Sequence, residues 1–268
     1  MKRGEILKFR ENVHVALWGR ESWEISVHPA GPGVVEGGVF AGRPLAEVEP
    51  GFHLLVKVID AKDSLSVQVH PNEGTCALTG GEPKSEMWAM LEDGVIYAGF
   101  KPGTTPSDVE AAVGAGSLEK LLVRHEAKKG EAYYLPGGLV HSIGGGSLIY
   151  EVQQSSDTTF RLYDWNRVGK DGVPRELHVE KAMKAVDCSL PAPLPARDVR
   201  CPFFDFRQIR LDGELELPAS DGFTALFAAE GSFAANGVEV PYRTSALAAP
   251  GAPAVLRGRA LVFATRQA

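Results

Sequence analysis

The sequence predicts a mostly β fold. Its 268 residues include 30 glycines and 18 prolines, which indicates many turns, while 44% hydrophobic and 23% charged residues are ordinary proportions for a globular protein. Runs rich in β-branched and aromatic residues recur between glycine- and proline-rich stretches, as in chains built from short strands. A chain of this length can bury a core as one large β domain or as two compact halves.

The charge balance and the cysteines limit the partners and the compartment. A formal net charge of -6 gives no general attraction to nucleic acid or to an anionic membrane, so we expect small-molecule partners. The three cysteines lack CxxC spacing, which argues against a disulfide framework and fits a reducing compartment. No stretch resembles a signal peptide or a long apolar span. We therefore expect a soluble, cytoplasmic protein, and the sequence makes no prediction of its oligomeric state.

Three segments in the first hundred residues are predicted to form strands. Residues 15–30 and 52–70 alternate or cluster β-branched and aromatic residues between turn-rich stretches. Residues 86–100 contain Glu92-Asp93-Gly94 between two apolar runs. This pattern predicts a hairpin, because glycine accepts the positive φ that such turns need.

The middle of the chain changes to a helical period over residues 104–125. Thr105 and Asp108 have the spacing of a capping box, and a glycine-rich break precedes a second short helix. We expect a small helical insertion here. Residues 130–167 return to strand signals with many glycines, and 174–186 are predicted to form a linking helix.

A proline-rich segment at about residue 191 marks a predicted domain boundary. After it, residues 203–268 show only strand-like runs separated by turn residues, and they contain no histidine. Their turn residues follow a rhythm similar to that of residues 130–151. We therefore divide the chain into residues 1–190 and 191–268, and we expect the second part to be a β-barrel half without metal ligands.

Candidate metal ligands occur at strand spacing. Gln68 and His70 are two residues apart, so in an extended strand both side chains leave the same face and can reach one ion. A single inward histidine is more often a hydrogen-bonded core residue. Gln68 and His70 therefore indicate a metal site only if the sequence contains further ligands. His141 supplies one, because it ends the pattern G-x5-P-x-G-x2-H over residues 130–141, whose glycines and proline turn the chain tightly.

That pattern matches the second motif of the cupin superfamily of jelly-roll β-barrels. The first cupin motif normally presents H-x-H and a glutamate soon after, whereas here Gln68 and His70 form the pair and Glu86 follows later. This departure, together with PKSEMW, PGGLVH, EVQQSSDTTFR and RELHVEKA, resembles the type I mannose-6-phosphate isomerase family in its short bacterial form. The resemblance covers most of residues 15–185 and implies that residues 1–190 form a cupin-type β-barrel that carries the active site.

In that family, the positions matching Gln68, His70, Glu86 and His141 are the zinc ligands. The resemblance therefore implies one zinc ion per chain. The residue types agree with it, since two imidazoles, a carboxylate and an amide oxygen form a mixed site that suits Zn²⁺ and leaves room for water or substrate. The same donors could also hold Fe(II), Mn²⁺ or Co²⁺.

The resemblance also implies catalytic residues. Glu151, Asp157 and Arg161 follow the His141 strand, where by residue type alone they could form a solvated face or, for Asp157, a turn. In the family, the matching residues lie in the active site. Arg161 can fix a sugar phosphate or a developing enediolate charge through a bidentate contact.

Lys84 precedes Glu86 by two residues, so on an extended segment it projects toward the same cavity. A lysine beside a bound cation gives up its proton more easily, which makes Lys84 our first choice for the proton carrier. Glu151 and Asp157 are the alternatives, and by residue type Lys84 could also be a surface lysine in a glycine- and proline-rich loop.

Three further residues are predicted to bind substrate. Lys57 and Ser66 occupy strand positions that face the substrate in related enzymes, so we assign them to the phosphate. Trp18 resembles a tryptophan that lines the family's pocket, although a core tryptophan fits the sequence nearly as well.

The implied reaction is the interconversion of mannose 6-phosphate and fructose 6-phosphate, in which a proton moves between C2 and C1 through a cis-enediol. Two other enzyme types stay open, another cupin sugar-phosphate isomerase and an Fe(II)-dependent oxygenase, because this barrel carries many chemistries. A non-catalytic sugar-phosphate-binding cupin is the alternative outside the enzymes.

Overall fold

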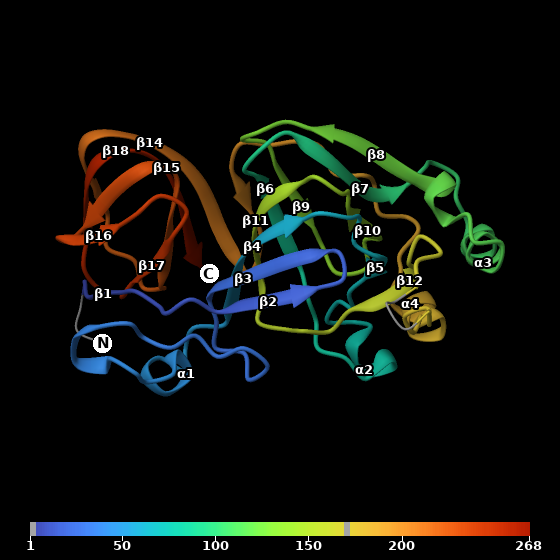
Figure 1. Ribbon diagram of the computed structural model, residues 1–268, viewed down its shortest axis with the longest axis horizontal. Helices are drawn as coiled ribbons and strands as arrows, with labels where there is room; N and C mark the ends of the chain where they lie inside the picture. The colour runs from blue at the N-terminus through green and yellow to red at the C-terminus, as the bar shows by residue number, and fades with distance from the viewer. Residues whose placement is uncertain (1–3, 169–171) are drawn as a thin grey trace. The chain divides into compact units, whose positions relative to one another are not determined.

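The computed structural model describes residues 4–168 and 172–268, and it confirms a mostly β chain (Figure 1). The strands are β1 Ile6–Leu7, β2 Val13–Ala16, β3 Gly19–Ile25, β4 Leu54–Ala61, β5 Val67–Val69, β6 Glu86–Met90, β7 Gly94–Phe100, β8 Leu122–Ala127, β9 Ala132–Leu135, β10 His141–Ile143, β11 Leu148–Gln154, β12 Phe160–Tyr163, β13 Val199–Arg200, β14 Phe204–Leu217, β15 Thr224–Ala235, β16 Val238–Val240, β17 Ser245–Ala248 and β18 Ala254–Gln267. The α-helices are α1 Leu45–Val48, α2 Cys76–Thr79, α3 Pro106–Gly114 and α4 Val179–Ala185, and the 3-10 helices are η1 Gly38–Phe40 and η2 Leu118–Leu121. Within the described ranges, none of these helices is long and apolar enough to cross a membrane.

The strands form three sheets. One has the order β12-β5-β10-β7-β8, a second has the order β2-β3-β4-β11-β6-β9, and the third has the order β1-β17-β15-β18-β14-β13 with β16 paired to β15. Neighbouring strands such as β10 and β5, or β14 and β18, run antiparallel.

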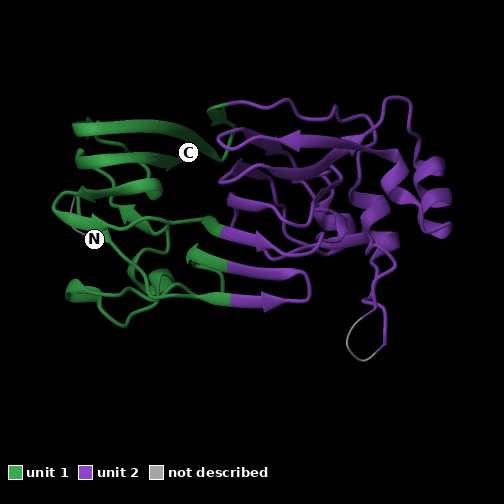
Figure 2. Cartoon of the chain, turned by 45° about the horizontal axis from the view of Figure 1, so that its top comes forward, with its two compact units in different colours: residues 1–13, 22–57, 197–268 green, residues 14–21, 58–196 purple. Residues whose placement is uncertain are grey.

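The chain divides into two compact units, coloured separately in Figure 2. Unit 1 contains residues 1–13, 22–57 and 197–268, and unit 2 contains residues 14–21 and 58–196. This division differs from the predicted boundary at residue 190 mainly in the first 57 residues. One reason for the difference is that β1, near the start of the chain, pairs with β17 near its end, so both strands belong to unit 1. The assignment of residues 1–190 as the catalytic domain stays a prediction.

Unit 2 contains a barrel core between two sheets. Buried apolar side chains from both sheets meet there, and they include Ile59, Trp88, Ile96, Tyr133 and Ile149. The outer face of the five-stranded sheet is covered as well, because Val67 and Val69 of β5 pack in a second cluster with residues of α3, η2 and α4. Since side chains alternate along a strand, Gln68 between these valines faces the barrel side.

The helical insertion is confirmed in its first half. Thr105 and Asp108 form the predicted capping box at the start of α3, with the Asp108 backbone N–H donating to Thr105 Oγ1 at 3.3 Å. The second helical segment, η2, is a short 3-10 turn, and the strand β8 begins at Leu122. The linking helix α4 begins only at Val179, five residues later than residue 174.

The predicted hairpin at residues 86–100 is wrong. β6 and β7 belong to different sheets, so the turn between them carries the chain from one sheet of the barrel to the other. Gly94 does not have a positive φ. A glycine is needed there for space, since a Cβ at this position would lie 2.6 Å from Ser147 Oγ.

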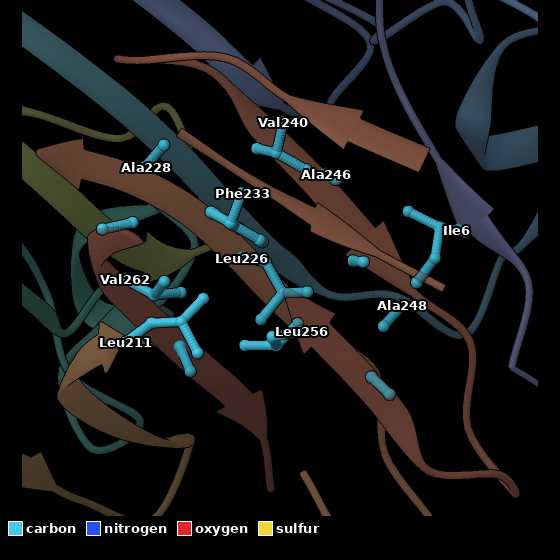
Figure 3. Close-up of a cluster of buried hydrophobic side chains, with 14 residues drawn as sticks. Ile6, Leu211, Leu226, Ala228, Phe233, Val240, Ala246, Ala248, Leu256 and Val262 are labelled. Atoms are coloured by element: carbon cyan, nitrogen blue, oxygen red, sulfur yellow. The ribbon is translucent and has the colours of Figure 1, made fainter. Parts of the chain in front are cut away.

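Unit 1 is built on the long antiparallel strands β14, β15 and β18. Their apolar side chains form a core that includes Leu211, Leu226, Phe233, Leu256 and Val262 (Figure 3). Most of the residues that fill this core are aliphatic or alanine. The strand-rich C-terminal segment predicted from the sequence is therefore confirmed.

Candidate metal centre

Three buried side chains converge in unit 2. His70 follows β5, Glu86 begins β6 and His141 begins β10. The Nε2 atoms of the two histidines are 3.1 Å apart, and the carboxylate oxygens of Glu86 lie 3.4 Å from His70 Nε2 and 3.3 Å from His141 Nε2. Among the described residues, this is the group of histidine, cysteine and acidic side chains that could hold a metal ion.

The turn before His141 explains how the chain brings these residues together. The Gly138 N–H donates to the His70 carbonyl at 2.8 Å, so the turn docks directly on the segment that carries His70. Gly137 has no room for a side chain, because a Cβ would lie 2.7 Å from the Pro71 carbonyl oxygen, and Gly138 has a φ of 95°. The glycines of the sequence pattern therefore serve this close approach.

Backbone hydrogen bonds orient both imidazoles. Nδ1 of His70 lies 2.7 Å from the Thr158 carbonyl oxygen, and Nδ1 of His141 lies 2.8 Å from the Leu139 carbonyl oxygen. A carbonyl only accepts, so each Nδ1 carries the proton and each Nε2 keeps its lone pair. Metal-binding histidines are usually fixed in this way.

Burial and the ammonium group of Lys84 influence the protonation states of the other residues in the site. The Glu86 carboxylate accepts no hydrogen bond from the described residues, although Lys84 Nζ lies 3.1 Å from its Oε2. Burial alone would raise the pKa of Glu86, but Lys84, His70 and His141 together outweigh burial and hold that pKa well below its usual range. Burial, assisted by Lys84, lowers the pKa of His70 to about 3, and burial also lowers the pKa of His141. Neutral imidazoles and an ionised carboxylate are the forms that bind metals.

The site fits a divalent cation. Ligands held about 2.0–2.1 Å from a tetrahedral zinc ion lie about 3.3 Å from one another, close to the spacings seen here. Glu86 Oε1 has no hydrogen-bond partner among the described residues and lies 3.3 Å from His141 Nε2, which also favours a cation between them. Gln68 lies directly opposite His141 in the β5–β10 register, on the same face, and its Oε1 accepts a hydrogen bond from Ser66 Oγ at 3.2 Å.

Two further buried groups lie beside this centre. Lys84 is 4% exposed and Glu151 is 3% exposed. Trp88 donates its indole N–H to Glu151 Oε2 at 2.8 Å, and its ring meets His141 edge to face at 5.3 Å between centroids. Trp88 thus links His141 to Glu151. The sequence did not predict this role, and Trp88 appeared there only as part of the segment PKSEMW.

Comparison with known proteins identifies the family. No family model matches the chain. A mannose-6-phosphate isomerase from Bacillus subtilis is 32% identical over 240 residues, which cover 79% of this chain and 76% of the relative. The chain belongs to the mannose-6-phosphate isomerase family. A relative of the same name from Streptococcus mutans is 36% identical over 187 residues, and this match spans 59% of that relative's length.

Solved structures confirm the expected fold. The crystal structure of the mannose 6-phosphate isomerase from Bacillus subtilis aligns with a TM-score of 0.85 and 24% identity, covering 97% of this chain and 99% of that chain. A zinc-bound mannose 6-phosphate isomerase aligns with a TM-score of 0.70 and 15% identity, covering 98% and 99%. At these identities the likeness establishes the fold alone.

In this member of the mannose-6-phosphate isomerase family, Arg161 and Asp157 occupy different surroundings. Arg161 lies on β12 directly opposite Gln68, so it faces the same side of the sheet. Burial, followed by the charge of Arg175, lowers the pKa of Arg161. Asp157 is exposed in the loop before β12, next to Thr158, whose carbonyl orients His70.

The three predicted substrate-binding residues are all buried. Ser66 hydrogen-bonds to Gln68, as described above, and Trp18 packs in the barrel core of unit 2. Lys57 belongs to unit 1, where its Nζ lies 5.0 Å from the centroid of the Trp23 ring. Their roles toward substrate stay predictions.

Proposed function

We propose that the protein interconverts mannose 6-phosphate and fructose 6-phosphate with a divalent metal ion, zinc, bound by Gln68, His70, Glu86 and His141. The observation that carries the proposal is the convergence of His70, Glu86 and His141 beside the buried Lys84. The named relatives support the substrate, and the zinc-bound structural neighbour supports the metal. The donor set of two imidazoles, a carboxylate and an amide oxygen supports zinc on chemical grounds.

The reaction moves a proton between C2 and C1 of the open-chain sugar. A bound zinc ion would supply a positive centre for the oxygens on these carbons. Lys84 is our candidate for the proton carrier, since its Nζ is buried and lies 3.1 Å from Oε2 of Glu86. Glu151, held by Trp88, and Asp157 are the alternatives for this step.

Arg161 is the candidate for the substrate's negative charge. Its guanidinium makes no hydrogen bond or ion pair that involves the described residues, so its five donors are available to an anion. A planar guanidinium can hold a phosphate or an enediolate through two parallel bonds. Lys57, Ser66 and Trp18 stay our candidates for contacts to the substrate.

An assay of the chelated protein tests the proposal. We expect little turnover of mannose 6-phosphate after chelation and recovery when zinc is added. The same donor set is typical of Fe(II) oxygenases. Iron-dependent oxygen consumption without isomerase activity would therefore favour that function, and tight sugar-phosphate binding without turnover would favour a non-catalytic role.

The compartment is also a proposal. Cys76, Cys188 and Cys201 are all free thiols, which supports a reducing cytoplasm. Fractionation of the cells that make the protein, with detection of the enzyme activity, would test this.

A further inference from the structure

His178 precedes helix α4 and makes two hydrogen bonds to one residue of β12. The Arg161 N–H donates to His178 Nδ1 at 3.2 Å, and the His178 backbone N–H donates to the Arg161 carbonyl at 2.8 Å. β12 is the edge strand of the five-stranded sheet, and α4 packs along it (Figure 1). His178 therefore bonds to Arg161 as a residue of an additional strand would, with a ring nitrogen as the acceptor in place of a carbonyl oxygen. We call these two hydrogen bonds the rung.

This rung determines which type of antiparallel pair Arg161 forms with Gln68 of β5. Because the N–H and C=O of Arg161 both bond to His178, Arg161 and Gln68 are a pair without hydrogen bonds between them. In antiparallel sheets such pairs have the closer spacing, about 4.5 Å between Cα atoms, and their side chains are nearer to each other. The Arg161 side chain therefore lies close to that of Gln68, on the face of the sheet that also carries His141.

We propose that His178 is a positioning residue whose neutral imidazole locks the backbone of Arg161 and so holds the guanidinium next to Gln68. The guanidinium has no bond with the described residues to direct it, so its placement depends on the backbone below it. The part of this inference that concerns substrate rests on the proposed function. The hydrogen bond itself does not.

The rung requires the unprotonated form of the ring. Protonation turns Nδ1 from an acceptor into a donor, which would then face the Arg161 N–H. Burial, followed by the charge of Arg161, lowers the pKa of His178, with Lys181 of α4 acting in the same direction. Glu176 and a hydrogen bond with the Thr159 backbone oppose the shift, while α2 and β5, which also pack on α4, carry no charged residue. With a lowered folded-state pKa, the rung is intact above the ordinary histidine pKa and is lost as pH falls through the folded value.

Nuclear magnetic resonance of the zinc-loaded protein tests the rung without substrate. We expect the ring nitrogens of His178 to show the tautomer protonated at Nε2, and the Arg161 amide to exchange slowly with solvent. In His178→Ala the exchange should be about tenfold faster, which corresponds to a loss of about 1.4 kcal/mol, within the range for one hydrogen bond. A proton on Nδ1 at neutral pH, or equal exchange in both proteins, would overturn the proposal.

Kinetics then test what the rung does. His178→Ala should raise KM for mannose 6-phosphate about tenfold at unchanged zinc content, whereas His178→Asn should recover most of the affinity because its Oδ1 can replace Nδ1 as acceptor. We expect KM of the native protein to rise in acid, and this rise should be weaker in His178→Asn, since that side chain does not titrate. His125→Asn, on the opposite edge strand β8, is the matched control and should behave as native.

The results separate the two proposals. If the native protein has no isomerase activity, the proposed function fails while the tautomer and the amide exchange still decide the role of His178. If His178→Ala has native KM, or if His178→Asn is no better than His178→Ala, the positioning role is wrong even in an active enzyme.

Discussion

Unit 1 and unit 2 are both antiparallel β structures, but they use the buried faces of their strands differently. In unit 1, the core on β14, β15 and β18 consists of residues such as Leu226, Phe233 and Val262. In unit 2, strands of the barrel bury an apolar core and also Lys84 and Glu86 at the metal centre. Lys84 and Glu86 pair at 3.1 Å, but a buried ion pair is often no more stabilising than apolar residues of similar volume, so stability does not explain this arrangement.

The difference shows that the strands alone do not decide the chemistry of the molecule. Both units supply neighbouring strands with side chains at regular spacing. Only the placement of polar residues at inward positions, next to turns that bring separate segments together, makes a site in unit 2. The Gly137–Gly138 turn against His70 is the local feature that achieves this.

Removing a metal ligand should have the largest effect on metal content and activity. A small effect would contradict the difference drawn here between unit 1 and unit 2. We expect His70→Ala and His141→Ala to lose most bound metal and nearly all isomerase activity, a greater loss than the roughly 10–100-fold caused by changing a residue that only supports a ligand. Metal analysis of the purified folded variants measures this. His125→Ala is the control, and full zinc occupancy in the ligand variants would contradict the assigned site.

Lys84→Arg should have the next largest effect. The guanidinium keeps the charge beside Glu86 but cannot act as a base near neutral pH, so turnover should fall about a hundredfold or more while metal is retained. Exchange of deuterium at C2 of the substrate should stop. Lys62→Arg, at an exposed lysine of the same unit, should not change turnover. Near-native turnover of Lys84→Arg would point to Glu151 as the base.

Arg161→Lys tests whether a positive charge alone, without the paired donors of a guanidinium, is enough to bind the negative charge of the substrate. A lysine supplies a point charge without paired donors, so we expect kcat/KM to fall about tenfold or more with metal content unchanged. Steady-state kinetics with mannose 6-phosphate measure the loss. Arg124→Lys on β8 serves as control. Native kinetics in Arg161→Lys would show that the planar fork is not used.

Leu226→Ala in unit 1 should have the smallest effect on chemistry and a clear effect on stability. A buried leucine replaced by alanine lowers the free energy of unfolding by about 2–5 kcal/mol. The folded variant should still bind zinc and turn over. Denaturant unfolding and metal analysis check this against Leu215→Ala, which is partly exposed on β14 and should cost much less. Loss of zinc in folded Leu226→Ala would mean that the two units are not independent in this respect.

The sequence was sufficient to select the three side chains that converge, His70, Glu86 and His141, while the ligand role of Gln68 stays a prediction. Spacing placed Gln68 and His70 on one face, and the glycine pattern identified His141, because such patterns follow from strand geometry and turn sterics. The family resemblance added Glu86 across an intervening loop. The hairpin at Gly94 failed for the opposite reason: an acidic-glycine turn between apolar runs has the same local signal whether the strands pair with each other or belong to two sheets.

What the sequence determined by itself is therefore local: the strand periods, the capping box of Thr105 and Asp108, and the residue types of the metal site. The tertiary structure decided which distant segments meet. It joined β1 to β17, placed Trp88 between His141 and Glu151, and set His178 on the backbone of Arg161. These contacts have no sequence period, because they depend on how separate strands and loops pack in space, and packing is a property of the whole chain rather than of any one segment.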